Sequence, residues 1–325
     1  MKKAKILFIA IFLVLSSSLL IGCMNDDDIS NNYGKLSIKI TDAPMDYNQF
    51  MEVSITIDKI EIRKVNKNKE DEIIVLADEP FTTNMLNLVN GITETLADTN
   101  LPVGDYDLIR LYFSSTKMIL KNGKNYSSNM DYDDHDTYNN WSGGMMNGGM
   151  MNGGMMNGGM MMDGMMMNGD NNSMDIHLNP YLHIGNGIDE TYLLDLDISQ
   201  SFQCNDVQYG NMGSGNWMDM SGYSFAPVMR FVNLSETGTV EGTVRSDSTD
   251  MKEVTVYLMQ GSEIYTTTHT DQNGNYRFIG IPKGTYNVIV EMDGYMMDTN
   301  QGSNNVGMTP GSLTTVNCFM IPTND

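Results

Sequence analysis

Hydrophobic and polar residues alternate along most of the chain beyond residue 33. Side chains of a β-strand point alternately to the two faces of a sheet, so a period of two predicts strands with one buried face. The alternation is clearest in residues 36–40, 53–62, 106–113, 192–198 and 223–232. Asn122-Gly123 separates two strand-like stretches and predicts a hairpin turn. A helical period is rare, and we expect at most a turn or two of helix, at residues 83–88 and 92–96.

From residue 238 the alternation returns in shorter stretches, separated by glycine, proline and Asn-Gly turns. These stretches are residues 239–244, 254–258, 264–268, 270–278 and 281–290. Strands at a spacing of ~8–12 residues are typical of a β-sandwich. We therefore predict an all-β protein with two β-sandwich-like domains in tandem, residues 33–233 and 238–322.

The N-terminus predicts a lipid anchor. Three lysines within the first five residues precede an apolar run at residues 6–15, which is typical of a secretory signal peptide. The run is shorter than the ~20 apolar residues of a membrane-spanning helix. Residues 20–23, Leu-Ile-Gly-Cys, resemble the lipobox of bacterial lipoproteins. The resemblance implies cleavage before Cys23, acylation of its sulfur and attachment to a lipid bilayer, whereas an incidental cysteine is the alternative.

The N-terminal region thus divides into a signal peptide, residues 1–22, and a lipidated polar tether, residues 23–32. Asp26-Asp27-Asp28 resembles the surface-export signal of some lipoproteins, and a solvated tether explains it equally well. We expect the protein in the bacterial cell envelope, at the outer membrane or the cell surface rather than the inner membrane. The formal net charge of −22 argues against nucleic acid as a partner, because its phosphates would be repelled.

Several motifs of the first domain resemble one family. Thr41-Asp42-Ala43-Pro44 ends the first expected strand, and residues 101–111 follow the pattern Leu-Pro-x-Gly-x-Tyr-x-x-Ile-Arg-Leu. Further matching segments are residues 53–57, 84–91, 194–197 and 226–230. Together they resemble the DUF4382 domain over residues 33–233. The resemblance implies a secreted or lipid-anchored protein and supplies no catalytic residues.

The second domain carries motifs of another family. Residues 238–244 follow Gly-x-Val-x-Gly-x-Val, and residues 270–278 follow Thr-Asp-x-x-Gly-x-Tyr-x-Phe. Residues 282–288 follow Pro-x-Gly-Thr-Tyr-x-Val. The segment 238–322 resembles the carboxypeptidase regulatory-like domain. The resemblance implies a transthyretin-like sandwich that serves as a stalk or accessory module and is not itself a peptidase.

Aspartates stand at several expected strand ends and turns. We expect Asp42, Asp195 and Asp197 to stabilise turns, since Asp hydrogen-bonds forward to the backbone and Pro44 fixes the backbone of its turn. A calcium or sugar site at the strand ends is the alternative. Asp271 and Asn273 have the same two interpretations, and we favour an Asx-stabilised hairpin turn over calcium ligation.

A low-complexity insertion interrupts the first domain at about residues 130–174. Gly-Gly-Met-Met-Asn occurs three times in succession from residue 143, and the repeat then becomes irregular. Paired glycines oppose any ordered conformation, so we predict a disordered Met/Gly-rich loop. Thioether sulfur is a soft ligand that selects Cu(I). The candidate metal ligands are Met145, Met146, Met150, Met151, Met155, Met156, Met160, Met161, Met165, Met166 and His135.

The tract permits other interpretations. Replication slippage produces perfect short repeats, and a surface loop tolerates such an insertion. Exposed methionines can also absorb oxidants or form an adaptable protein contact. The tract resembles Met-rich segments of periplasmic copper-resistance proteins in composition, but it lacks their Met-x-x-Met and Met-His spacings. Cu(I) is therefore a candidate cofactor rather than an assigned one.

The sequence carries no motif of a catalytic centre. It lacks a phosphate-binding loop and a Gly-x-Ser-x-Gly elbow, and none of its four histidines has glutamate three positions on. Cys204 and Cys318 are expected to be buried free thiols. A two-carboxylate glycosidase is the open alternative, because its acids can come from distant strands. We predict that the protein is not an enzyme.

Two functions are consistent with these observations. The first is an accessory or adhesive binding module displayed from the membrane, with a carbohydrate or an envelope protein as its ligand. Clustering of Trp141, Trp217, Tyr209 and Tyr223 on the surface would favour a carbohydrate. The second is a Cu(I)- or Ag(I)-binding envelope lipoprotein that uses the Met-rich loop.

Overall fold

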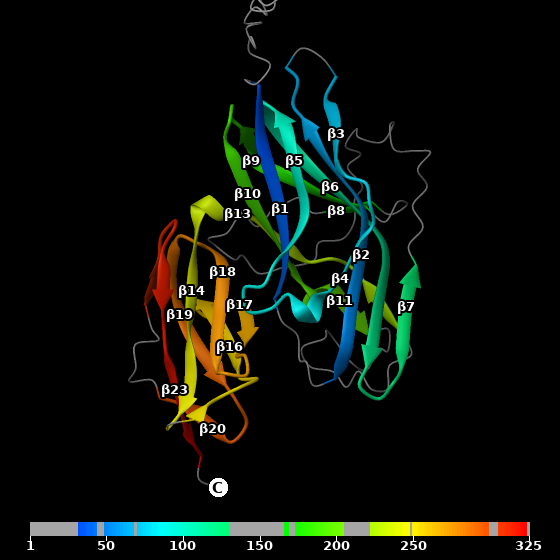
Figure 1. Ribbon diagram of the computed structural model, residues 1–325. Coiled ribbons are helices and arrows are strands. Elements are labelled where there is room, and N and C mark those ends of the chain that lie inside the picture. The colour runs from blue at the N-terminus through cyan, green and yellow to red at the C-terminus, as the bar shows by residue number, and fades with distance from the viewer. Residues whose placement is uncertain are drawn as a thin grey trace, which may run out of the picture.

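The chain folds into β-sheets arranged in two units (Figure 1). The computed structural model describes residues 32–43, 49–67, 70–129, 166–168, 173–204, 222–247, 249–298 and 305–323. We call strands β1–β13 the N-terminal unit and strands β14–β23 the C-terminal unit. Within the described residues the helical elements are short: α2 (Ile198–Ser201) and the 3₁₀ turns η1 (Met85–Asn87) and η4 (Leu234–Glu236). The all-β prediction is confirmed.

The N-terminal unit is built from two main sheets. One has the order β13-β10-β1-β5, in which β1 and β10 are parallel and the other pairs are antiparallel. Its strands are β1 (Tyr33–Ala43), β5 (Glu94–Pro102), β10 (Asp189–Asp197) and β13 (Met229–Asn233). The other has the order β3-β2-β6-β9-β8, with β4 on β2 and β7 on β6. Its strands are β2 (Phe50–Lys64), β3 (Glu72–Ala77), β4 (Phe81–Asn84), β6 (Gly104–Leu120), β7 (Asn125–Asn129), β8 (Met166–Asn168) and β9 (Ser173–Ile184).

The predicted alternation forms the core of this unit. Leu36, Ile38 and Ile40 are buried on one face of β1, and Lys39 between them is partly exposed. The core sides of β2 and β6 contribute further aliphatic and aromatic side chains to the same cluster. Burying such side chains supplies the main favourable term of folding, at roughly 25 cal/mol per Å² of apolar surface. A small additional sheet of β11 (Phe202–Cys204) and β12 (Tyr223–Phe225) packs its aromatic rings against this core.

The C-terminal unit is a second sandwich with its own core. Its first sheet follows β15-β14-β23-β20, with β18 and β22 also paired to β14, and its second follows β17-β16-β19-β21. Valines of β14, β16 and β19 lie between the two sheets. The strands are β14 (Thr237–Ser246), β15 (Thr249–Asp250), β16 (Thr255–Gln260), β17 (Glu263–His269), β18 (Asn275–Pro282), β19 (Gly284–Glu291), β20 (Tyr295–Met297), β21 (Val306–Met308), β22 (Leu313–Thr315) and β23 (Cys318–Pro322).

The same turn device occurs once in each unit. Tyr106 donates its hydroxyl hydrogen bond to the carbonyl oxygen of Pro102 at 2.6 Å, and Tyr286 does so to Pro282 at 3.1 Å. Each tyrosine ring is buried and each bond closes a Pro-x-Gly-x-Tyr segment between two strands. The two motifs that carried the family resemblances are therefore structural, since they fix where the strands turn.

The structure differs from the sequence predictions at a few elements. Residues 94–96 belong to strand β5, where pairing with β1 overrides the weak helical period that we predicted. The other predicted helical segment contains the 3₁₀ turn η1. Asn122-Gly123 forms the expected turn between β6 and β7, with Gly123 at a φ of 86°.

The end of the Met-rich tract also differs from our expectation. We predicted a loop throughout, whereas the backbone of Met166–Asn168 forms strand β8 and pairs antiparallel with β9. Residues 141–165 of the tract lie outside the described residues. The predicted signal peptide and Cys23 lie outside them as well. No helix in the described part of the chain is both long and apolar enough to span a bilayer.

Cys318 is a buried free thiol, as predicted. Burial raises the pKa of the Cys318 thiol to about 11, and a hydrogen bond with Tyr276 opposes this shift. The side chain of Cys204 lies outside the described residues.

We expect Cys318 to resist a thiol reagent in the folded protein. At pH 8 only about one thiol in a thousand would be ionised, and burial also excludes the reagent. In a Cys23→Ser/Cys204→Ser background, reaction with Ellman's reagent should be slow in buffer and complete in denaturing urea. Rapid reaction without denaturant would contradict the burial of this thiol.

Candidate functional site

A groove of about 380 Å³ lies where the two units meet. Strands β9, β10 and β13 form one side, and η4, the start of β14 and the end of β18 form the other. We call it the junction groove, and the residues that give it its chemistry are Tyr181, His183, Glu190, Tyr192, Phe231 and Asn233. Ligand sites of this size commonly lie at domain interfaces, with an apolar lining and a few placed polar groups.

Tyr181 and Tyr192 line the junction groove, and the buried core residue Phe231 supports Tyr192. Tyr192 and Phe231 stack with their ring centroids 4.8 Å apart and their planes at 15°. They lie on adjacent strands, because Tyr192 pairs with Asn233 and Leu194 with Phe231 in the β10–β13 register. Tyr181, from β9, also lines the groove and is 55% exposed. An exposed tyrosine thus stands beside a stacked aromatic pair.

Polar groups stand next to these rings. Asn233 donates from its side-chain amide to a carboxylate oxygen of Glu190 at 2.8 Å, while its Oδ1 accepts from the backbone of Ser235. These bonds hold the Asn233 amide and the Glu190 carboxylate in fixed orientations. At the rim, Nδ1 of His183 lies 2.8 Å from Asp105, and both side chains are exposed.

The three aspartates predicted at strand ends come together in space. The parallel register places Thr41 beside Asp195 and Ala43 beside Asp197, so β1 and β10 end side by side. Asp197 caps α2 by accepting from the backbone of Gln200, and Asp42 Oδ1 accepts from the backbone of Ile198 at 3.3 Å. Burial, followed by the charges of Asp197 and Asp195, raises the pKa of Asp42 well above its ordinary value. Asp197 thus stabilises the local backbone as expected, whereas Asp42 bonds to Ile198, which is distant in sequence, and Asp195 pairs with Arg230. Asp42 Oδ2 has no hydrogen-bond partner among the described residues.

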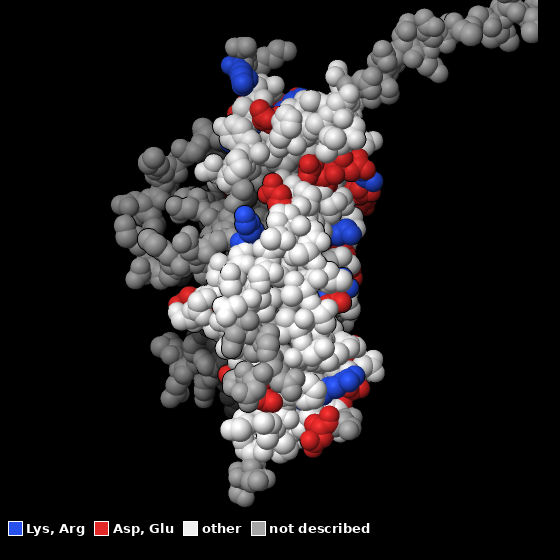
Figure 2. All heavy atoms as spheres, turned by 90° about the vertical axis from the view of Figure 1, so that its left-hand side faces the viewer, with Lys and Arg blue, Asp and Glu red and all other residues white. Residues whose placement is uncertain are grey.

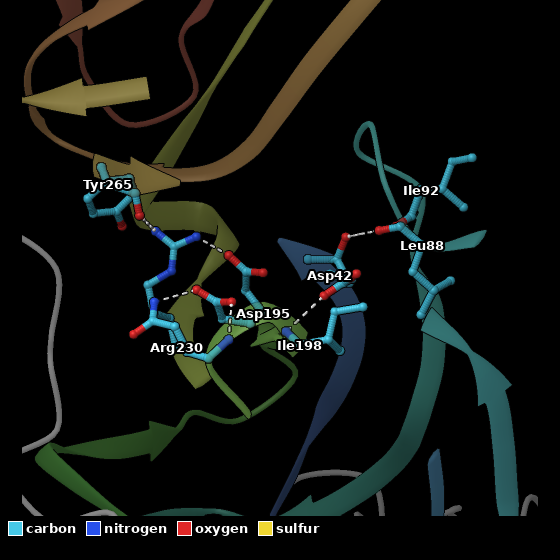
Figure 3. A network of polar contacts seen from close by, with 10 residues as sticks. Asp42, Leu88, Ile92, Asp195, Ile198, Arg230 and Tyr265 are labelled. Atoms are coloured by element: carbon cyan, nitrogen blue, oxygen red, sulfur yellow. Dashed lines mark hydrogen bonds and ion pairs between the residues drawn. The ribbon is translucent and has the colours of Figure 1, made fainter. Parts of the chain in front are cut away.

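Arg230 connects this cluster to the C-terminal unit. Its guanidinium forms an ion pair with Asp195, its neighbour on the adjacent strand. The same guanidinium donates to the backbone carbonyl of Tyr265 at 3.2 Å and lies 4.3 Å from the centroid of the Tyr265 ring. Figure 3 shows Asp42 and Asp195 between Arg230 on one side and the segment of Leu88 and Ile92 on the other.

The remaining predicted site residues have different outcomes. Asp271 forms the expected turn, with Oδ1 accepting from the backbones of Asn273 and Asn275 at 2.8 Å. Tyr223 was expected on the surface, but it is half-buried because its ring packs against Phe202 at 5.4 Å. The other three aromatic candidates lie outside the described residues, namely Trp141, Trp217 and Tyr209.

The copper prediction is untested by the structure. Its methionines and His135 lie outside the described residues, except for the backbone of Met166 in β8. In the described part of the chain, no group of three or more His, Cys, Asp or Glu side chains is arranged to hold a metal ion.

The sequence did not predict the junction groove. Tyr181, Glu190 and Tyr192 occupy ordinary alternating positions, and no motif singles them out. The sequence held one weak signal for the groove: aromatic residues occupy partly exposed strand positions on either side of the 184–189 turn. Only the placement of the second unit makes these positions a groove.

Two family comparisons confirm the resemblances. The family described as Domain of unknown function (DUF4382) matches residues 33–213. The family described as carboxypeptidase regulatory-like domain matches residues 239–320. A search among curated proteins finds no match.

The solved structures that match the chain include pilins and the Bacillus anthracis TIE protein. BcpA, the major pilin subunit of Bacillus cereus, is 9% identical, with 90% of this chain and 71% of that chain covered, at a TM-score of 0.21. The Bacillus anthracis TIE protein is 11% identical, with 89% and 51% covered and a TM-score of 0.21. The shaft pilin SpaA from Lactobacillus rhamnosus GG is 7% identical, with 91% and 99% covered and a TM-score of 0.24. TM-scores this low carry no argument about function.

Proposed function

The chain belongs to the DUF4382 family, and from its junction groove we propose that it is a glycan-binding protein of the bacterial cell envelope that performs no catalysis. The observation that carries this proposal is the exposed Tyr181 beside the stacked Tyr192–Phe231 pair and the Glu190–Asn233 hydrogen bond. Aromatic faces cover the apolar face of a sugar ring, while carboxylate and amide groups bond its hydroxyls.

The dimensions and chemistry of the groove support a neutral or basic sugar ligand. A hollow of about 380 Å³ holds a short oligosaccharide segment rather than a whole polymer. Glu190 and Glu236 contribute negative charge to its lining, and the chain as a whole is acidic. Anionic polysaccharides would therefore be disfavoured.

The setting of the groove agrees with this role. Figure 2 shows one face of the molecule, on which charged side chains lie mainly along one edge and near the two ends, while uncharged residues cover most of the rest. In our proposal Cys23 anchors the mature chain to a membrane, and the polar tether holds both units away from the bilayer. A protein displayed in this way would meet the glycans of the envelope or of a neighbouring cell.

We expect Tyr181→Ala to weaken glycan binding about tenfold, or ~1–2 kcal/mol, because it removes the exposed ring of the groove. The matched control is Tyr33→Ala, since Tyr33 is 51% exposed, about as much as Tyr181, and does not line the groove. The chain from residue 24, which keeps every described residue, would be screened on a glycan array. The best ligand would then be titrated by calorimetry against the wild type and both variants.

Two outcomes would contradict the proposal. One is that no glycan binds the wild type on an array that includes bacterial envelope sugars. The other is that a glycan binds and Tyr181→Ala leaves its affinity the same as Tyr33→Ala does.

A further inference from the structure

One small pocket is lined by four residues with buried side-chain oxygens that have no hydrogen-bond partner among the described residues. They are Asp42 Oδ2, Asn90 Oδ1, Asp195 Oδ1 and Thr268 Oγ1. The pocket has a volume of about 20 Å³ and lies apart from the junction groove. Buried polar atoms almost always have partners, so four such atoms around one space require an explanation.

The four oxygens come from separate parts of the fold. Asp42 ends β1 and Asp195 lies near the end of β10, while Asn90 follows η1 and Thr268 belongs to β17 of the C-terminal unit. Asp42 and Asp195 are 6% exposed and Thr268 is 2% exposed. Thr268 is not part of the acidic cluster. It lines the pocket from the opposite unit, and its hydroxyl has no partner among the described residues.

Neighbouring contacts fix the orientation of these groups. Nδ2 of Asn90 donates a hydrogen bond to the backbone carbonyl of Asn275 at 3.3 Å, while Oδ1 has no partner among the described residues. Asp42 Oδ1 is held by the backbone of Ile198, and Asp195 Oδ2 by Arg230. Asn90, Asp42 and Asp195 therefore each use one polar atom to hold the side chain, and the other side-chain oxygen has no partner among the described residues.

The local charge is negative. Asp42, Asp195 and Asp197 lie together, and Arg230 neutralises one of these carboxylates. Arg277 also lines the pocket, but its aliphatic carbons lie closest to Gly91 and its Nε faces Glu241 at 3.7 Å. Unpaired buried carboxylates are costly unless a cation or a proton compensates them.

We propose that this pocket binds one calcium ion, with Asp42, Asn90, Asp195 and Thr268 supplying oxygen ligands and the ion joining the two units. Calcium accepts carboxylate, amide and hydroxyl oxygens in flexible geometry, whereas magnesium requires a near-ideal octahedron. A single water could accept from the Thr268 hydroxyl and donate to two of the other three oxygens, which leaves one carboxylate or amide oxygen without a partner from that water. Copper(I) would need soft ligands, and these four atoms are all hard oxygens.

The test measures calcium binding to the chain from residue 24 after treatment with a chelator. We expect calorimetry to give one site with a dissociation constant on the order of 10⁻⁴ M, the range of extracellular calcium modules. Calcium should also raise the melting temperature, because it binds the folded chain alone.

Variants locate the site. Asp42→Asn should weaken calcium binding about tenfold or more, since it removes a charged ligand and keeps the side-chain shape. Asn90→Gly and Thr268→Val should weaken it several-fold. Glycine suits position 90, whose φ of 59° is left-handed, and valine preserves the shape of threonine. Asp98→Asn is the matched control, because Asp98 is an exposed aspartate of β5 outside the pocket, and it should bind as the wild type does.

The proposal is overturned if the wild type binds no calcium up to about 10 mM, well above the expected dissociation constant. It is equally overturned if calcium binds and folded Asp42→Asn or Thr268→Val keeps the wild-type affinity, because the ion would then lie elsewhere on this acidic chain. Circular dichroism identifies a variant that fails to fold, and the remaining pocket variants then decide the outcome. Neither calcium binding nor its loss in the variants depends on whether the junction groove binds a glycan.

Discussion

Arg230→Ala is expected to lower the free energy of unfolding by about 3–5 kcal/mol, because it leaves the Asp195 carboxylate buried without its cation. The same substitution removes the hydrogen bond to the Tyr265 carbonyl and the contact with the Tyr265 ring. The loss should therefore affect both units. The free energy of unfolding would be measured by urea denaturation followed by circular dichroism. A chelator would be present, so that calcium binding does not contribute to the measured stability.

An exposed ion pair provides the control for Arg230. Arg245 and Asp250 form a pair at 2.8 Å with side chains that are 49% and 44% exposed. Removing such a pair costs about 0–1 kcal/mol, so Arg245→Ala should leave stability almost unchanged. If Arg230→Ala also costs less than about 1 kcal/mol, Arg230 does not hold the junction in the way we describe.

Arg110→Ala is expected to cost a similar 3–5 kcal/mol, but within the N-terminal unit. Arg110 forms two hydrogen bonds to Asp175, at 2.5 and 2.7 Å, between β6 and β9. The two side chains are only 6% and 11% exposed. Removing the arginine therefore leaves a largely buried carboxylate without its cation.

The position of Arg110 on β6 explains this burial. Ile109 and Leu111 face the core, and Arg110 lies on the opposite face between Leu108 and Tyr112, which are also buried. Urea denaturation of Arg110→Ala beside Lys35→Ala tests the prediction, since Lys35 and Asp98 form an exposed pair. Equal stabilities of the two variants would contradict it.

The sequence predicted the strands well because their signal is local. The alternation at Leu36, Ile38 and Ile40 marks a strand with one buried face whatever its neighbours are. Turns with fixed chemistry were equally visible, as at Asn122-Gly123 and at Asp271. At residues 94–96 the local helical period was misleading, because pairing with β1 determined the outcome.

The candidate sites depend on contacts between residues that are distant in sequence. Asp42 and Asp195 meet because β1 and β10 pair in parallel, and nothing in the alternation specifies that partner. Thr268 completes the pocket only because the C-terminal unit packs against those strand ends. Sequence reasoning identified the aspartates and offered calcium as an alternative, but it could not bring them together.

The junction groove is the centre of the functional proposal, and hydrogen–deuterium exchange tests it most directly. The exchange of the chain from residue 24 would be measured with and without the best array glycan. We predict that the glycan slows exchange in the backbone around Tyr181, Tyr192 and Asn233, while the far end of the C-terminal unit around Met296 exchanges unchanged. Protection confined to other segments, with none around these three residues, would contradict the account.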